Sequence, residues 1–279
     1  MGIAPAPGAD RRRVMGRSTN ERAAAAAGTF YPSDPDELAA QVDALLEGAH
    51  PHRDAGKPLA LIVPHAGYVF SGPVAGTAYA LLRGREIEKI TLLGPAHFVP
   101  LHGAAVPGTD VWRTPLGPVR IDPDLREIAV EAGAIADYRP HEPEHSLEVQ
   151  LPFLQRIFGS GLRALPVAVG VAGAVDVADL IAALLPHALA VVSTDLSHYH
   201  DRTTAERLDR RTAEAVLALD PDAIGREDAC GSFALRGLVE LARREGYAVR
   251  LLDLRTSADT AGDPSRVVGY GAFSVEGRA

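Results

Sequence analysis

Continuous apolar runs recur along the chain and alternate with amphipathic segments. Several runs consist of Ile, Leu, Val and Ala without interleaved polar residues, a pattern typical of strands buried on both faces of a sheet. Seven strands are predicted, over residues 59–65, 89–97, 103–107, 162–170, 189–198, 249–257 and 267–275. Helical patterns lie between them, over residues 34–47, 73–83, 123–132, 146–158, 176–185, 203–218 and 231–245. The alternation predicts an α/β domain whose central sheet is mostly parallel or mixed and carries helices on both faces.

Proline and glycine positions refine this outline. Pro152 lies inside the helical pattern of residues 146–158 and is expected to kink or delay that helix. Residues 113–122 place a proline and a glycine on either side of Leu116, which predicts a turn between two short strands. No internal repeat or long linker divides the chain, so we expect one domain over residues 23–279.

Composition narrows the class of protein. The 279 residues carry a net charge of −8, which argues against a nucleic-acid-binding protein, because such domains are usually basic. No apolar run approaches the roughly 18 residues that span a bilayer. Cys230 is the single cysteine, so no internal disulfide can form, and a cytoplasmic location is the simplest expectation. Residues 1–22 lack the apolar stretch of a secretory signal and are predicted to be a disordered tail.

Polar residues gather where the predicted strands end. His65 follows one apolar run, His97 follows the next, and Asp195 and His198 follow a third. Ser257 comes at the end of a fourth. Because the carboxyl ends of parallel strands share one edge of an open sheet, we expect these side chains to line a common crevice there. A carboxylate close to a histidine can orient the imidazole, so Asp195 is expected to steer His198.

Two further segments can contribute to the same crevice. His145 precedes the helix of residues 146–158, and Glu148 follows it by three positions, so both are expected on similar sides of the chain. Cys230 precedes the helix of residues 231–245, where a thiol tends to have a lowered pKa.

The histidines and Cys230 also have less specific interpretations. A single histidine is more often structural or exposed than functional, and Cys230 by itself is more often a small buried apolar residue. A nucleophilic pair of Cys230 and His198 is a third interpretation, which predicts a hydrolase that needs no metal. The chain contains no dinucleotide-binding glycine motif and no phosphate-binding loop.

Several sequence blocks together resemble one known family. The blocks, in chain order, are GTFYPSDPDEL, VPHAGYVFSG, GPAHF, TPLGPVRID, HSLEVQLPFLQ, STDLSHY, ACG and RVVGYGAFSV. They extend from about Gly28 to Val275 and are similar to the Memo-like family, whose bacterial and archaeal members are called AmmeMemoRadiSam system protein B. The family is similar in fold to class III extradiol dioxygenases, so the resemblance implies an α/β domain with a nonhaem metal site.

The resemblance also implies roles for particular residues. His65, His97 and Cys230 match the positions of metal ligands, with Fe(II) as the first choice and Cu or Zn as alternatives, because a thiolate makes a site softer. His198, with Asp195, matches a catalytic acid or base. His145 matches a further catalytic residue. We assign Tyr68, Glu148 and Ser257 to the substrate pocket.

Three functions follow as expectations. The first is a nonhaem-iron redox enzyme, similar to a dioxygenase, that acts on a small unidentified substrate, for which an aromatic compound is a candidate. The second is a metal-binding protein without catalysis that serves a radical SAM system, with a radical SAM protein and an AMMECR-type protein as partners. The third is the Cys–His hydrolase. No nucleic acid or membrane is expected as a partner.

Overall fold

The structure is a computed structural model that describes residues 20–49 and 56–277, and within them the strands form one mixed sheet. The order of the strands along it is β1-β5-β6-β8-β3-β9-β2-β12-β10, with β11 paired to β12 and β4 paired to β7 and β8. The strands are β1 (Glu21–Arg22), β2 (Pro58–Val63), β3 (Lys89–Pro95), β4 (Ala104–Val106), β5 (Val111–Thr114), β6 (Gly117–Ile121), β7 (Ile135–Ala136), β8 (Arg163–Val169), β9 (Leu189–Ser193), β10 (His198–His200), β11 (Ala248–Thr256) and β12 (Val267–Glu276).

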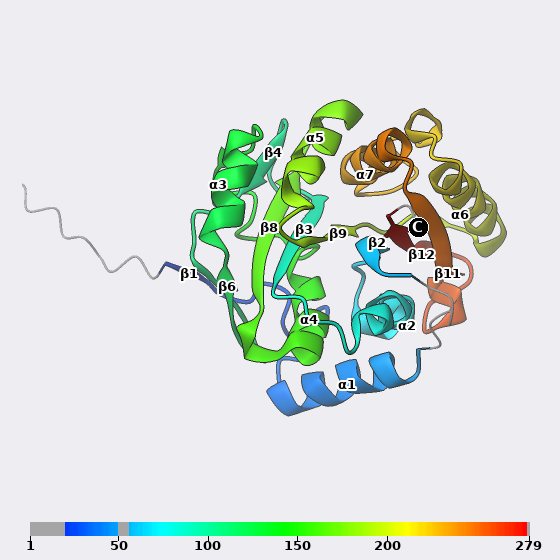
Figure 1. The fold of residues 1–279 in the computed structure, drawn as a ribbon. Coiled ribbons are helices and arrows are strands. Elements are labelled where there is room, and N and C mark those ends of the chain that lie inside the picture. Colours follow the sequence, from blue (N-terminus) through cyan, green and yellow to red (C-terminus); the bar gives the residue numbers. More distant parts are fainter. Residues whose placement is uncertain (1–19, 50–55, 278–279) are drawn as a thin grey trace, which may run out of the picture.

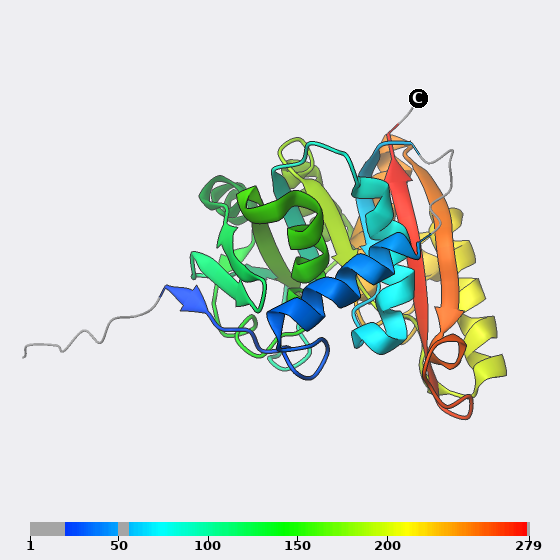
Figure 2. The ribbon, with the colours of Figure 1, turned by 90° about the horizontal axis from the view of Figure 1, so that it is seen from below.

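Seven α-helices cover this sheet in the described part of the chain. They are α1 (Pro35–Glu47), α2 (Tyr68–Tyr79), α3 (Pro123–Glu131), α4 (Leu151–Phe158), α5 (Ala174–Leu184), α6 (Arg202–Leu217) and α7 (Ser232–Glu245). Helices α1, α2 and α4 lie on one face and α3, α5 and α7 on the other, while α6 packs on β11 and β12 (Figures 1 and 2). The predicted α/β architecture is therefore confirmed. Over residues 20–49 and 56–277, each helix is too short or too polar to cross a bilayer.

The centre of the sheet is parallel and fully buried. Strand β3 pairs in parallel with β8 on one side and with β9 on the other, and β9 pairs in parallel with β2. Residues in the middle of these strands, such as Leu61, Leu92 and Val191, have no exposed surface, as expected for continuous apolar runs between two helical layers. The carboxyl ends of β2, β3, β8 and β9 consequently share one edge of the sheet.

Some predicted boundaries are wrong. The strand predicted over residues 189–198 ends at Ser193, and a separate short strand, β10, begins at His198. Helix α2 begins at Tyr68 and not at Pro73, which instead lies within the helix. As expected, Pro152 delays α4: a 3₁₀ turn, η2 (Glu148–Gln150), comes first, and the proline then stands in the first turn of α4, where its missing N–H costs no bond.

The N-terminal boundary also differs from the prediction. Residues 20–22 were assigned to a disordered tail, but Glu21–Arg22 form β1, which pairs in parallel with β5. The side chain of Arg22 is buried. The rest of the predicted tail, residues 1–19, lies outside the described residues.

Candidate metal centre

His65 stands at the carboxyl end of β2, directly after Pro64, and is almost completely buried. Its Nδ1 lies 2.9 Å from the hydroxyl of Ser193. That hydroxyl donates its single proton to the carbonyl of Ser146 and accepts a hydrogen bond from the amide of Gln150. The Ser193 oxygen can therefore only accept from His65, so the proton of the neutral ring sits on Nδ1. Its Nε2 carries the lone pair and lies 3.2 Å from the Sγ of Cys230.

His97 follows β3 and is held by the buried carboxylate of Glu144. One carboxylate oxygen of Glu144 accepts from the backbone N–H of His97 over 2.7 Å, and the other lies 2.9 Å from its Nδ1. Burial by itself raises the pKa of Glu144, but hydrogen bonds from His97 and from the N–H of Ser146 outweigh it and bring the pKa to about 2. The ionised carboxylate orients the ring with Nδ1–H toward itself and Nε2 away, as partners of metal-binding histidines do.

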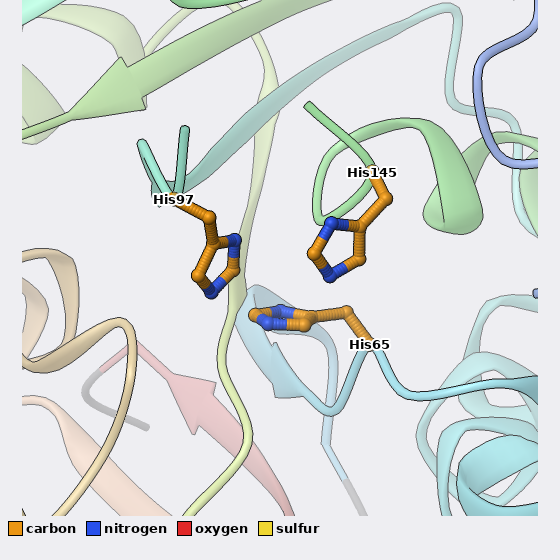
Figure 3. Close-up of side chains that lie close together, drawn as sticks. All are labelled: His65, His97 and His145. Atoms are coloured by element: carbon orange, nitrogen blue, oxygen red, sulfur yellow. The ribbon is translucent and has the colours of Figure 1, made fainter. Parts of the chain in front are cut away.

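His145 completes a group of three imidazoles. One ligand atom from each of His65, His97 and His145 lies within 4.8 Å of those of the other two. Figure 3 shows the three rings turned toward a common point, although they come from segments far apart in the sequence. Nitrogen atoms at this spacing can reach one metal ion with small side-chain adjustments.

The protonation of these rings suits metal binding. Burial, followed by the charge of His97, lowers the pKa of His65 to about 3. Burial, followed by the charge of His65, lowers the pKa of His145 to about 4. Both rings are thus neutral at neutral pH, which is the form that coordinates a metal. Because the three residues present converging imidazole nitrogens, with an oriented Nε2 on His65 and His97, they fit a divalent transition-metal ion.

Cys230 lies beside this group but outside it. Its Sγ is 3.2 Å from Nε2 of His65, and it accepts a hydrogen bond of 3.3 Å from the backbone N–H of Asp195. The thiol pKa that we expected to be lowered is raised instead, first by burial and then by the charge of Asp195. The prediction of an activated thiol at the start of α7 is therefore wrong, because desolvation outweighs the field of the helix N-terminus.

Asp195, in the loop after β9, and His198, the first residue of β10, do not form the expected pair. The carboxylate of Asp195 accepts from the backbone N–H of His65 over 2.7 Å, so it positions the turn that follows β2. Nδ1 of His198 lies 2.8 Å from the carbonyl of Leu196, which can only accept, so this nitrogen carries the proton. His198 is half-buried, and its Nε2 is the ring nitrogen that can accept a proton.

The three residues assigned to a substrate pocket are engaged inside the fold. Glu148 is fully buried, and its carboxylate accepts hydrogen bonds from the segment Arg22–Tyr31, so the prediction that it faces the crevice is wrong. The hydroxyl of Tyr68 donates to the carbonyl of Val149 over 2.6 Å. The hydroxyl of Ser257 accepts from the backbone N–H of Val268 over 3.2 Å.

Three residues that support the histidines were not predicted from the sequence: Glu144, Ser193 and Gln150, which donates to Ser193. The stretch EPEHSLE surrounds His145 with three carboxylates, and that density of acidic residues near a histidine was a usable signal. It does not distinguish Glu144, which supports His97, from Glu148, which binds the N-terminal segment.

Comparisons with known proteins find relatives over nearly the whole chain. The model of a family described as Memo-like protein matches residues 22–274. A MEMO1 family protein of Aeropyrum pernix is 36% identical over 274 residues, which cover 89% of this chain and 97% of the relative. One from Methanopyrus kandleri is 36% identical over 91% of this chain and 98% of its own length. One from Thermotoga maritima is 35% identical over 90% of this chain and 98% of its own.

Proposed function

The chain belongs to the Memo-like protein family, and from this membership and the histidine group we propose that it binds a divalent transition-metal ion through His65, His97 and His145. The observation that carries the proposal is the convergence of three imidazoles, two of which have their Nδ1–H fixed by Ser193 and Glu144. Imidazole nitrogens suit Zn, Cu and Fe, and the family resemblance favours Fe(II) among them.

The ligand set has two versions that share His65 and His97. The resemblance assigned Cys230 as the third ligand, whereas the geometry groups His145 with the other two histidines. Cys230 Sγ is close enough to His65 to serve as an alternative or fourth donor after a small movement. We propose His145 as the third ligand and keep Cys230 as the competing assignment, because replacing each separately distinguishes them.

As the reaction, we propose a redox conversion of a small organic substrate, with aromatic compounds as the first class to test. Bound iron would supply Lewis acidity and redox chemistry. His198 would receive or return a proton at Nε2, because its Nδ1–H is held by Leu196. Phe98 follows His97 directly, is 58% exposed, and lies 5.8 Å from the ring of His145, so its ring can pack on an apolar substrate at the edge of the centre.

An anaerobic titration with Fe(II), repeated with Zn(II), tests the binding site. The wild type is expected to bind one ion, and His65→Ala and His97→Ala are expected to lose it. His145→Ala is expected to lower the affinity more than Cys230→Ser does. His187→Ala, which removes an exposed histidine elsewhere, is the control. Unchanged stoichiometry in His65→Ala and His97→Ala would refute the site, and a larger effect of Cys230→Ser would replace His145 by Cys230.

Catalysis is tested separately from binding. Oxygen uptake by the iron-loaded protein over a panel of catechols is expected to depend on His198, so His198→Ala should abolish uptake while it leaves the bound iron in place. Full metal binding without uptake of oxygen on any compound would favour the second function, a non-catalytic metal-binding protein that serves a radical SAM system. The association of this chain with radical SAM and AMMECR-type proteins stays a prediction, as does its cytoplasmic location.

A further inference from the structure

His145 differs from the other two histidines in how its ring is held. Nδ1 of His65 and Nδ1 of His97 each have a hydrogen-bond partner, whereas buried Nδ1 of His145 has none in the structure. Its nearest carboxylate oxygen, on Glu144, is 3.5 Å away and already accepts from His97 and Ser146. The orientation of the His145 ring therefore depends on packing.

Two aromatic rings provide that packing. The ring of Phe30 stacks on His145, with centroids 4.2 Å apart and planes inclined by 22°. The ring of His97 also stacks on it, with centroids 4.7 Å apart and planes inclined by 18°. The rings of His65 and Phe98 meet His145 edge-on. Of the two stacked rings, His97 is itself fixed by Glu144, so Phe30 is the one whose position can decide where His145 points.

Phe30 belongs to a segment from which four hydrogen bonds to the rest of the domain end on one carboxylate, while the carbonyl of Phe30 itself accepts from the backbone N–H of Tyr68 over 2.8 Å. We call residues 22–31 the N-terminal strap. One oxygen of Glu148 accepts from the backbone N–H of Ala25 over 2.8 Å and from the guanidinium of Arg22. The other accepts from the N–H of Ala26 over 2.8 Å and from the hydroxyl of Tyr31. All four donors are in the strap, and the carboxylate they surround has no exposed surface.

The strap also holds the loop that carries His145. Arg22 donates to the carbonyl of His141 over 2.6 Å and to the carbonyl of Glu144 over 2.7 Å, and its guanidinium lies 4.2 Å above the ring of Trp112. The loop of residues 141–148 is thus bound to the strap at both ends, at His141 by Arg22 and at Glu148 by the four donors. The N–H of Val149 bonds to the carbonyl of His145, which links that residue to the same anchor.

We propose that Glu148 is a positioning residue of the metal centre, which acts by holding the N-terminal strap so that Phe30 keeps His145 in place as the third nitrogen ligand. The inference rests on the proposed function, because it assigns a support to one ligand of that site. It requires that His145 lose its position when the strap is released, while His65 and His97, held by Ser193 and Glu144, keep theirs.

A buried ion pair can matter for stability alone, so the test needs a second buried carboxylate for comparison. Asp122 provides it: the residue is fully buried, pairs with Lys89 and Arg163, and caps α3. Lys89 and Arg163 begin β3 and β8, so this pair lies at the opposite ends of the strands from the histidines. Asp122→Asn is therefore matched to Glu148→Gln in burial and charge but not in location.

The experiment titrates Co(II) anaerobically and records the visible absorption spectrum, which reports the donor set, together with the midpoint of thermal unfolding. Wild type is compared with His145→Ala, Glu148→Gln, Phe30→Leu, Phe30→Tyr and Asp122→Asn. Loss of a residue that orients a metal ligand typically lowers affinity about 10- to 100-fold. Glu148→Gln and Phe30→Leu are expected to lower Co(II) affinity in that range and to shift the spectrum toward that of His145→Ala. Phe30→Tyr, which retains the ring, should resemble wild type, and Asp122→Asn should lose thermal stability without a spectral change.

Wild-type spectra and affinities in both Glu148→Gln and Phe30→Leu would overturn the proposal, and Phe30→Leu serves alone if Glu148→Gln does not fold. An equal spectral change in Asp122→Asn would also overturn it, because the effect would then follow from lost stability. Failure of the proposed function has a different signature, since wild type would then bind no Co(II), or His97→Ala would bind it as wild type does.

Discussion

Glu144 and His97 are joined twice, through the backbone N–H at 2.7 Å and through Nδ1 at 2.9 Å. Both contacts use a carboxylate without exposed surface, so the position of the residue and the orientation of its ring are set together. Replacement of Glu144 by Gln puts an NH₂ group where one of these acceptors stands. We expect Glu144→Gln to weaken metal binding about 10- to 100-fold, measured by competition with a chelator. An affinity equal to wild type would show that His97 needs no carboxylate.

The thiol of Cys230 is expected to be unreactive in the folded protein. Its pKa is raised by burial and by the charge of Asp195, and the thiolate is the form that reacts. Alkylation by iodoacetamide at pH 7.5 should therefore be slow in native protein and fast in urea, as measured by mass spectrometry. Rapid alkylation of the native protein would instead favour the Cys–His hydrolase, which requires an activated thiol.

Stability is expected to fall as the pH decreases from about 6.5 to about 4. Burial lowers the pKa of His141 to about 4, so in this range the unfolded chain binds a proton that the folded chain does not. The resulting loss is on the order of 3 kcal/mol for one such residue. His141→Gln can still donate to the carbonyl of Ala105 and should flatten this dependence in urea unfolding at several pH values. The same slope in the variant would show that His141 titrates normally.

Helix α7 packs against α5 at Gly237, where no side chain fits. A Cβ atom at this position would lie 2.3 Å from a methyl group of Val177. Gly237→Ala is expected to lower the free energy of unfolding by about 1–3 kcal/mol, as overpacking does. The control is Gly161→Ala, because a Cβ atom there has nothing within 4 Å. Val177→Ala in the Gly237→Ala background should recover part of the loss; if it does not, the clash lies elsewhere.

Much of the architecture could be predicted because apolar runs and strand ends are local features. The runs before His65 and His97 are continuous enough to indicate central strands, and a parallel sheet then brings their carboxyl ends together. The division of residues 189–198 into β9 and the separate strand β10 could not be predicted from such local features. The backbone of that segment leaves the sheet after Ser193 because Thr194 and Leu196 bond to Val63 and Gly269, which are distant in the sequence.

The support of the site was harder to predict for the same reason. Glu144 and Glu148 both flank His145, and either could have faced it. Glu148 points away because its donors are residues 22–31, more than a hundred positions earlier. Similarly, the proton on Nδ1 of His65 depends on how Ser193 shares its hydroxyl with Ser146 and Gln150. Such assignments require the tertiary structure.

The position of β12 has a consequence for biosynthesis. This strand ends at Glu276, yet it lies inside the sheet between β2 and β11, and its pairing with β2 joins residues 273–276 to residues 58–62. A nascent chain therefore cannot close the sheet beside β2 until residues 273–276 have left the ribosome, long after residues 58–62. Until then, one edge of β2, the strand that precedes His65, lacks its partner. Metal uptake at His65 should accordingly follow the emergence of β12 from the ribosome.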